Sequence, residues 1–152
     1  MRIMLDTSVL VAAFVEGHAA HAPAFRRLQR VKDGVDRGVV AAHSLAETYS
    51  ILTRLPIRPI ITPDMAREII TVNIVDRCEV VALSAADYVT LLRHLASLKI
   101  AGGAIYDALL LHVAWLSGVD QVLTLNAKDF RRVYPVLTGK IVSLIEEMVD
   151  SS

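Results

Sequence analysis

The sequence predicts an α/β protein with three layers, in which a central parallel sheet of four to five strands lies between two layers of helices. Short apolar runs alternate with longer segments of helical periodicity, a pattern typical of strand–helix–strand units. Hydrophobic residues make up 54% of the chain, and the excess is mostly Ala, Val, Leu and Ile, which suits strands buried on both faces. The 152 residues contain no repeat or linker, so we expect one domain over residues 1–152.

The first half of the chain opens with an apolar run, Arg2–Leu5, which predicts a strand that ends at Asp6. Thr7 or Ser8 can cap the helix that follows. Pro63 suits the first position of a later helix that Thr62 caps. After the first strand we expect, in order, a helix from about Val9, a helix over His18–Val31, a strand over Val39–Ala42, a helix from Ser44 that stops before Pro56, and a helix over Met65–Val75.

The second half continues the alternation. Ser84 is a predicted helix cap, Gly102 and Gly103 break the chain, and the segment after them is helical and almost wholly apolar. We therefore expect that segment to lie in the centre of the core. The predicted elements are a strand over Glu79–Leu83, a helix ending near Leu98, a buried helix over Ala104–Leu116, a strand over Gln121–Leu125, a short helix from Asn126, and an edge strand over Ile141–Ile145.

Charge and cysteine content exclude several classes of protein. The 16 basic and 16 acidic side chains cancel, so any phosphate-binding surface must be a local patch. Cys78 is the only cysteine and can form neither an internal disulfide nor a cysteine pair for zinc, which favours a reducing, cytoplasmic location. Asp6 and Glu16 bracket the apolar run Val9–Val15, so we expect a buried segment there and neither a secretion signal nor a membrane span.

Five acidic or amide residues occupy mostly apolar surroundings. Asp6 follows the first strand, Glu47 lies early in the helix after the second, Asp107 opens the apolar helix, and Asn126 and Asp129 follow the fourth strand. Ligands of parallel sheets bind at the carboxyl ends of strands. Carboxylates in apolar surroundings need a positive partner, and Mg²⁺ or Mn²⁺ prefers such oxygen ligands. The pattern therefore indicates a divalent-metal site at that edge.

Each of these residues also has a purely structural interpretation. Asp6 can end a strand and cap the next helix, and Ser44 with Glu47 can form a capping box. Asn126 and Asp129 can act as a capping pair. Asp107 is the hardest to explain in this way, because its neighbours in the helix are apolar.

Four segments in order resemble the motifs of PIN-domain nucleases, and among these the VapC-like toxins of toxin–antitoxin pairs. The segments are Met4–Val11, Ser44–Tyr49, Gly103–Leu109 and Thr124–Phe130, and the resemblance spans nearly the whole chain. It implies a PIN fold and an endoribonuclease that depends on Mg²⁺ or Mn²⁺. It also implies an RNA substrate, a small antitoxin partner and a homodimer.

By the same resemblance, Asp6, Glu47 and Asp107 would be metal ligands or hold metal-bound waters, with Asn126 or Asp129 in the fourth acidic position. Asn126 departs from the family, which more often has Asp at this position. The metal site would then carry one negative charge fewer. A catalytically inactive PIN module that serves only for interaction is therefore an alternative. An RNA-processing nuclease without an antitoxin is another alternative.

Other polar and aromatic residues have weaker functional interpretations. Thr7, Ser8 and Thr124 could hold carboxylates or metal-bound waters, although capping and ordinary strand content explain Ser8 and Thr124 well. Tyr49 and Tyr106 could be platforms on which bases stack, but core positions are the preferred interpretation. Four basic residues of the second helix could contact RNA, but a solvated helix face is the preferred interpretation; they are Arg26, Arg27, Arg30 and Lys32. The histidines lack the spacing of a zinc hydrolase.

Overall fold

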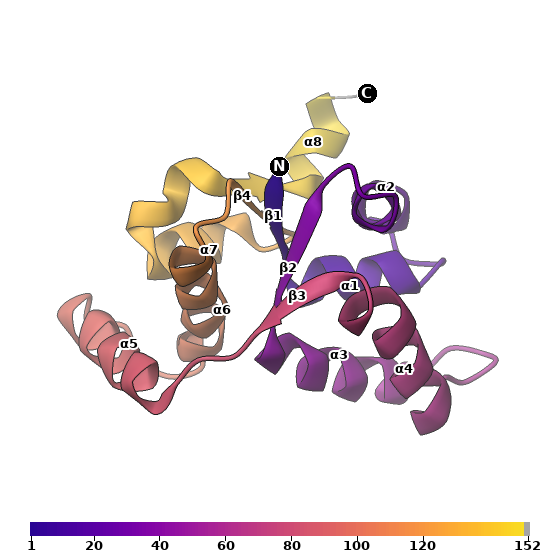
Figure 1. The fold of residues 1–152 in the computed structure, drawn as a ribbon, viewed down its shortest axis with the longest axis horizontal. Helices are drawn as coiled ribbons and strands as arrows, with labels where there is room; N and C mark the ends of the chain where they lie inside the picture. The colour runs from indigo at the N-terminus through magenta and orange to yellow at the C-terminus, as the bar shows by residue number, and fades with distance from the viewer. Residues whose placement is uncertain (151–152) are drawn as a thin grey trace.

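A single parallel sheet organises residues 1–150, the part of the chain that the computed structural model describes. The strand order is β3-β2-β1-β4-β5, and every neighbouring pair is parallel. The predicted parallel α/β fold is therefore confirmed, with five strands (Figure 1). The strands are β1 (Arg2–Leu5), β2 (Arg37–Ala41), β3 (Cys78–Val81), β4 (Gln121–Thr124) and β5 (Ile141–Ser143).

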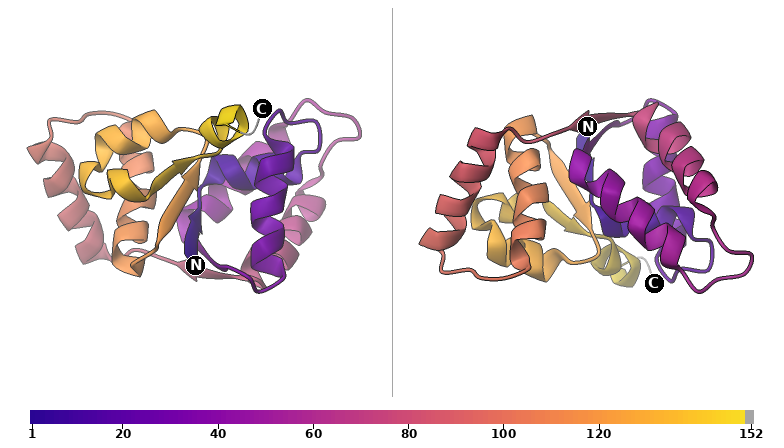
Figure 2. Two further views of the ribbon diagram at one scale, coloured as in Figure 1. Left: turned by 90° about the horizontal axis from the view of Figure 1, so that it is seen from above. Right: turned by 90° about the horizontal axis from the view of Figure 1, so that it is seen from below.

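Helices cover both faces of this sheet, as the views from above and below show (Figure 2). Most of the helices come from the segments between strands, as parallel connections require. They are α1 (Thr7–Phe14), α2 (His21–Lys32), α3 (Ala42–Arg54), α4 (Pro63–Ile70), the π-helix η1 (Thr71–Val75), α5 (Ala85–Ser97), α6 (Ala104–Ser117), α7 (Ala127–Val133), the 3₁₀ helix η2 (Pro135–Lys140) and α8 (Leu144–Asp150). Within residues 1–150, no helix is long and apolar enough to cross a bilayer.

Alternating residues of the central strands divide the core into two clusters. Met4 points into the cluster built with α5, α6 and α7, whereas Ile3 and Leu5 point into the cluster built with α1 and α2. The period of two along a strand explains this alternation, because successive side chains leave opposite faces of the sheet. In α6 the run from Ala108 to Ala114 is buried, which confirms the predicted central position of that helix.

The parallel register brings the carboxyl ends of the strands to one edge. Leu5 pairs with Leu123, and the Asp6 N–H donates to the Leu123 carbonyl at 3.1 Å. Ala41 pairs with Val81 in the same direction. The segments that start α1, α3 and α7 therefore leave the sheet at this carboxyl edge, which is where the sequence places its acidic residues.

Several predicted boundaries differ from the structure. The helix expected over His18–Val31 begins at His21, and the one expected over Met65–Val75 begins at Pro63 and changes to the π-helix at Thr71. The predicted cap does form, because Thr62 Oγ1 accepts from the Met65 N–H. The edge strand expected over Ile141–Ile145 ends at Ser143. The amphipathic residues after it continue as α8, whose first residue, Leu144, is buried.

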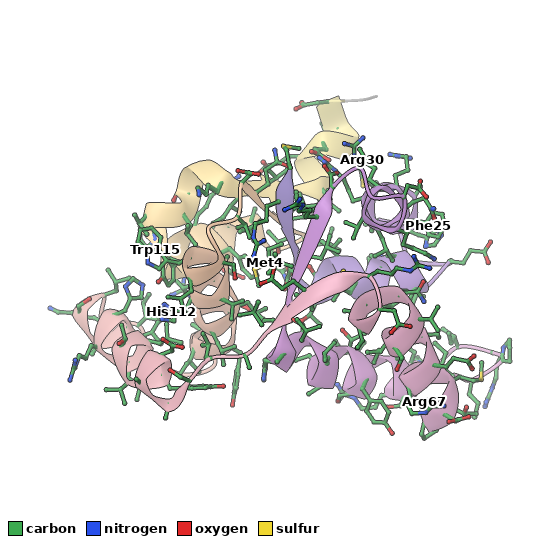
Figure 3. All side chains as sticks on the ribbon, in the orientation of Figure 1. Met4, Phe25, Arg30, Arg67, His112 and Trp115 are labelled. Atoms are coloured by element: carbon green, nitrogen blue, oxygen red, sulfur yellow. The ribbon has the colours of Figure 1, made fainter. Side chains whose placement is uncertain are left out.

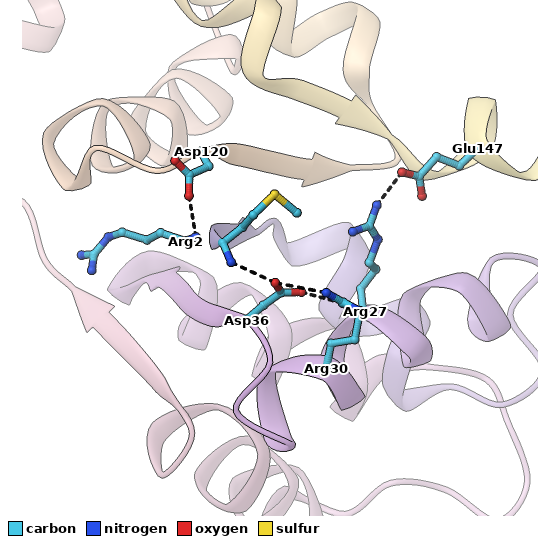
Figure 4. Close-up of polar contacts among 7 residues, drawn as sticks. Arg2, Arg27, Arg30, Asp36, Asp120 and Glu147 are labelled. Atoms are coloured by element: carbon cyan, nitrogen blue, oxygen red, sulfur yellow. Dashed lines mark hydrogen bonds and ion pairs between the residues drawn. The ribbon is translucent and has the colours of Figure 1, made fainter.

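The opposite, amino edge of the sheet holds a separate charge cluster around Asp36 (Figure 4). Its buried carboxylate accepts from Arg30 at 2.7 Å and from the Met1 ammonium group at 3.2 Å. Hydrogen bonding from Arg30 is the main reason that the pKa of Asp36 lies below its usual value. Arg27 pairs with Glu147, and Lys32 donates to Asn73. Three of the four basic residues of α2 thus make intramolecular contacts, and the fourth, Arg26, is exposed, as the preferred solvated-face interpretation expects.

Candidate active site

Asp6 is a buried carboxylate at the carboxyl end of β1. It is 3% exposed and occupies the N-cap position of α1, but its side chain makes no capping hydrogen bond. Its Oδ2 instead accepts from Ser8 Oγ at 2.6 Å and from Thr124 Oγ1 at 2.8 Å. The capping interpretation of Asp6 is therefore wrong. Ser8 and Thr124, expected mainly as cap and strand residues, orient this carboxylate.

Burial has a direct electrostatic consequence for Asp6. Loss of water around the carboxylate raises the pKa of Asp6, and the neighbouring charge of Glu47 raises it further, while the hydroxyls of Ser8 and Thr124 act in the opposite direction. No ion pair within residues 1–150 neutralises Asp6. A buried negative charge held only by neutral donors is a position at which a cation would be stabilised.

Glu47 reaches the same edge from the second turn of α3. Its Oε1 accepts from Thr7 Oγ1 at 3.0 Å, and the Thr7 hydroxyl also lies 2.9 Å from Ser44 Oγ. Because α3 begins at Ala42, Ser44 is already inside the helix and is fully buried against Thr7. The predicted capping box of Ser44 and Glu47 is therefore wrong.

Asp107 lies in the first turn of α6, where the carboxylates come together. Its pKa is raised to about 6, first by burial and then by the charges of Asp6, Asp129 and Glu47. Arg132 of α7 acts in the opposite direction on the pKa of Asp107. The charges of Asp6, Glu47 and Asp129 thus all act on Asp107, although the four residues come from four separate segments of the chain.

The fourth motif contributes two differently placed residues. Asn126 is exposed at the N-cap position of α7 and makes no side-chain cap hydrogen bond, so the predicted capping role is not observed. Its backbone N–H donates to Thr124 Oγ1, the same hydroxyl that donates to Asp6. Asp129, in the first turn of α7, acts on Asp107 through its charge.

Two aromatic residues differ from their predicted role in the core. Tyr49 is 41% exposed and Tyr106 is 55% exposed. Tyr106 precedes Asp107 and stacks on His43, with ring centroids 5.6 Å apart and planes inclined by 8°. His43 in turn has its Nε2 3.6 Å from Glu47 Oε1. No sequence signal indicates this pair beyond the closeness of each member to an acidic motif.

The donor set fits a hard divalent cation. Within residues 1–150, no three His, Cys, Asp or Glu side chains are already drawn together as a metal cluster. However, the groups that converge are carboxylate oxygens supported by hydroxyl donors, which Mg²⁺ and Mn²⁺ prefer, often with several waters retained. Burial and the neighbouring negative charges together raise the pKa of Asp107, and a bound cation would offset both effects.

Comparisons with known proteins agree with this arrangement. The PIN-domain family profile matches residues 3–135. Ribonuclease VapC40 of Mycobacterium tuberculosis is 40% identical over 132 residues, which cover 84% of this chain and 87% of that protein. Ribonuclease VapC27 of the same species is 36% identical over 107 residues, covering 70% of this chain and 72% of that protein.

Two solved structures share the fold at low sequence identity. The crystal structure of Mycobacterium tuberculosis VapC20, described as a Sarcin-Ricin loop cleaving toxin, has a TM-score of 0.61 at 20% identity and covers 79% of this chain and 86% of that one. VapBC2 from Rickettsia felis, bound to a promoter DNA fragment, has a TM-score of 0.61 at 19% identity and covers 88% and 94%. Together with the family match, these likenesses show that the chain belongs to the PIN-domain family, in which its curated relatives are VapC ribonucleases.

Proposed function

We propose that this protein is a metal-dependent endoribonuclease that hydrolyses RNA phosphodiester bonds and acts as the toxin of a VapBC-type pair. One structural observation carries the proposal: the buried carboxylate of Asp6, at the carboxyl edge of the sheet, accepts from the hydroxyls of Ser8 and Thr124 and has no ion-pair partner within residues 1–150. The ribonuclease relatives supply the reaction class.

The proposed roles follow from how each side chain is held. Asp6, Glu47 and Asp107 would bind Mg²⁺ or Mn²⁺, with Asp129 or Asn126 completing the set. When bound, such an ion supplies positive charge for the phosphoryl oxygens and a water of lowered pKa. Hydroxyl donors from neighbouring elements fix the orientation of Asp6 and Glu47, as expected of groups that support metal ligands.

The substrate is proposed to be single-stranded or loop RNA. VapC20, which shares this fold, is a toxin that cleaves the Sarcin-Ricin loop, and that target supports the choice. Arg132 lies near Asp107 and is exposed on α7, so it is placed to contact a phosphate beside the carboxylates. We propose it, in place of the basic residues of α2, as a phosphate contact.

Cleavage of a labelled RNA tests the activity. Purified protein is incubated with single-stranded and hairpin RNA in Mn²⁺, in Mg²⁺ and in a chelator, and products are resolved on gels. We expect cleavage that a chelator stops and that Asp107→Asn removes. Asp76→Asn is the matched control, because Asp76 is exposed and precedes β3 at the opposite edge of the sheet. Undiminished cleavage by the Asp107→Asn protein would assign the activity to another site or a contaminating nuclease.

A groove next to α3 supports the antitoxin partner. It has a volume of about 620 Å³ between α3 and α4, and its lining includes Leu45, Tyr49, Arg67 and Ile70. Ala46 of this groove also lines a neighbouring cavity together with Glu47, so a peptide seated in the groove could extend a basic side chain past Ala46 toward Glu47. We propose that a small antitoxin binds in this way, in the cytoplasm, to a homodimer of this chain.

Expression in a bacterial host separates the toxin from an RNA-processing nuclease. We expect growth arrest on induction, relieved by co-expression of the small protein encoded next to this gene. We also expect Ala46→Arg, which fills the groove with a charged side chain, to weaken that relief while growth arrest persists. A protein that cleaves RNA in vitro but has no effect on growth would favour the processing role. A protein that binds Mn²⁺ without cleaving RNA would favour the inactive interaction module.

A further inference from the structure

The edge of the candidate site carries two aromatic side chains that the metal chemistry does not use. Tyr106 lies in the first turn of α6 and His43 in the first turn of α3, and their rings are nearly parallel. Asp107 follows Tyr106 in the chain, and Glu47 follows His43 by one helical turn. Each ring thus lies within one helical turn of a proposed metal ligand, Tyr106 next to Asp107 and His43 one turn before Glu47.

Tyr106 has no evident role in stabilising the fold. It is 55% exposed although residues 108–114 of the same helix are buried, and its hydroxyl makes no hydrogen bond within residues 1–150. Its one ring contact is with His43, whose side chain is itself 28% exposed. A large aromatic ring held in a defined orientation, with much of its surface in water, is suited to contact a ligand.

The aromatic surface continues past His43 along the sheet edge. Tyr88 of α5 is 41% exposed and shares with His43 the lining of a cavity of about 120 Å³ beyond the ends of β2 and β3. Ala82 and Leu83 also line this cavity. The carboxylates are therefore bordered on the β2 side by aromatic and apolar groups and on the α7 side by Arg132.

We propose that Tyr106, supported by His43, stacks against a nucleobase of single-stranded RNA next to the phosphodiester that is cut. This inference rests on the proposed ribonuclease function and makes it more specific. Stacking is the expected recognition mode because the neighbouring carboxylates disfavour a phosphate against Tyr106, whereas every base has an apolar face. A paired base in a duplex has no free face, so the platform selects unpaired RNA.

The contacts of His43 hold it in place beside Tyr106. Its ring stacks on Tyr106, and its Nε2 lies 3.6 Å from the Glu47 carboxylate. Glu47 is in turn held by Thr7. His43 is thus a positioning residue for Tyr106, and its own variants should change base stacking through Tyr106.

The test uses the fluorescence of 2-aminopurine, which is quenched when the base stacks on an aromatic ring. A set of single-stranded RNAs carries one 2-aminopurine at successive positions, and the full-length Asp107→Asn protein binds them without cutting. We expect quenching at one or two neighbouring positions, loss of that quenching in Tyr106→Ala, and its recovery in Tyr106→Phe. Trp115→Ala is the matched control, since Trp115 is 51% exposed near the other end of the same helix (Figure 3).

Steady-state cleavage by protein with an intact Asp107 gives the second measurement. Tyr106→Ala should raise KM about tenfold, equivalent to about 1.4 kcal/mol, with a smaller change in kcat. For the unsubstituted protein, an RNA with an abasic nucleotide at the quenched position should raise KM by the same factor. On that RNA, the unsubstituted protein and Tyr106→Ala should have the same KM. His43→Ala should weaken quenching at the same position only.

The outcomes separate the two proposals. If the unsubstituted protein neither binds nor cuts RNA, the proposed function fails, and the platform fails with it. If it cuts RNA and Tyr106→Ala has unchanged KM and quenching, the platform alone is overturned. If Tyr106→Ala weakens binding of the antitoxin and leaves RNA unaffected, the exposed ring belongs to a protein interface, and the platform is again overturned.

Discussion

Asp107 shows how closely the negative charges of the site are packed. Burial, followed by three neighbouring carboxylates, raises its pKa from 3.8 to about 6. A carboxyl group whose pKa is raised by folding stabilises the folded state fully below its unfolded pKa. That contribution is lost as the pH rises through the folded value. The metal-free protein should therefore lose stability between about pH 4 and pH 6 for this reason.

Removing the Asp107 charge should reverse that loss. In a chelator at pH 8, Asp107→Asn should raise the Tm by about 2–4 °C, the shift that roughly 1 kcal/mol produces in a chain of this size. Solvent screening keeps the gain well below the full effect of the pKa change, because the carboxyl group is only partly buried. Differential scanning fluorimetry from pH 4 to pH 8 measures it, and the gain should vanish near pH 4. An equal or lower Tm at pH 8 would contradict repulsion among the carboxylates.

Asn126 stands at the position where the resemblance to PIN-domain nucleases leads us to expect Asp. Its side chain is exposed and makes no cap hydrogen bond, while its N–H shares the Thr124 hydroxyl with Asp6. Asn126→Asp should therefore add a negative charge next to Thr124, which donates to Asp6, without a large cost to α7, because the exposed Asn126 side chain has no cap hydrogen bond to lose. We expect tighter Mn²⁺ binding by calorimetry and altered RNA cleavage. Identical Mn²⁺ affinities of the two proteins would place Asn126 outside the site.

Local sequence signals predict the elements well where no distant contact competes with them. The Thr62–Pro63 start of α4 and the Ser84 cap of α5 both form, because the cap and its partners lie within one turn. Ser44 fails as a cap because Thr7, 37 residues earlier in the chain, packs against its hydroxyl, and no local pattern encodes that contact. At the end of β5 the deciding contact is local, because Ser143 Oγ accepts from the Glu146 N–H in the first turn of α8.

The candidate site is likewise predictable where its residues follow from the strand pattern, and it is not predictable where distant contacts decide. Acidic residues at strand ends can be identified from sequence because a parallel sheet brings those ends together. The hydroxyls that hold Asp6 and Glu47 are ambiguous in the sequence, since Ser and Thr also serve as caps. Tyr106 is predicted in the core because its helix is apolar on every side, and only the placement of α3 beside α6 leaves the ring exposed against His43.

Gly38 shows a constraint on β2 that the sequence does not reveal. A Cβ at this position would lie 2.7 Å from Cys78 Sγ and 2.8 Å from Cγ1 of Val31, so the glycine lets α2 pack closely over β2 and β3. Gly38→Ala should therefore destabilise the protein by about 1–3 kcal/mol, as overpacking of a core does. Urea unfolding measures the change. Gly17→Ala, where nothing lies within 4 Å, is the control and should be nearly neutral; equal stability of both variants would refute the packing constraint.

The molecule as a whole combines zero net charge with strong local segregation. Acidic groups collect at the carboxyl edge of the sheet, while Arg30 and Asp36 pair at the amino edge. A neutral molecule has no overall field to draw in RNA, so the local ion and the nearby cation must supply the attraction. Binding of RNA should consequently depend on the divalent ion more than on the rest of the surface.

The outer side of α5 is the surface that we expect to pair in a homodimer. This helix buries Leu91 and Leu95 against α6, whereas Val89 and Leu92 are 49% and 55% exposed. Exposed aliphatic side chains one turn apart on the outer side of a helix are suited to meet their counterparts in a second copy. A stable interface would bury over about 1,000 Å² in total.

Light scattering during gel filtration at micromolar concentration tests this arrangement. We expect a mass of twice 16.6 kDa for the unsubstituted chain. Leu92→Glu should shift it to the monomer, because two carboxylates would be buried face to face across the interface. Val35→Asp is the control, since Val35 is 56% exposed in the loop before β2, and its variant should remain a dimer. A dimer that survives Leu92→Glu would move the interface to another surface, whereas a monomeric unsubstituted protein would exclude the homodimer. The candidate site lies at the start of α6, the helix against which α5 packs, so a dimer formed through α5 would have its interface near the RNA-binding surface. Loss of the dimer should therefore change the affinity for RNA more than the affinity for the metal.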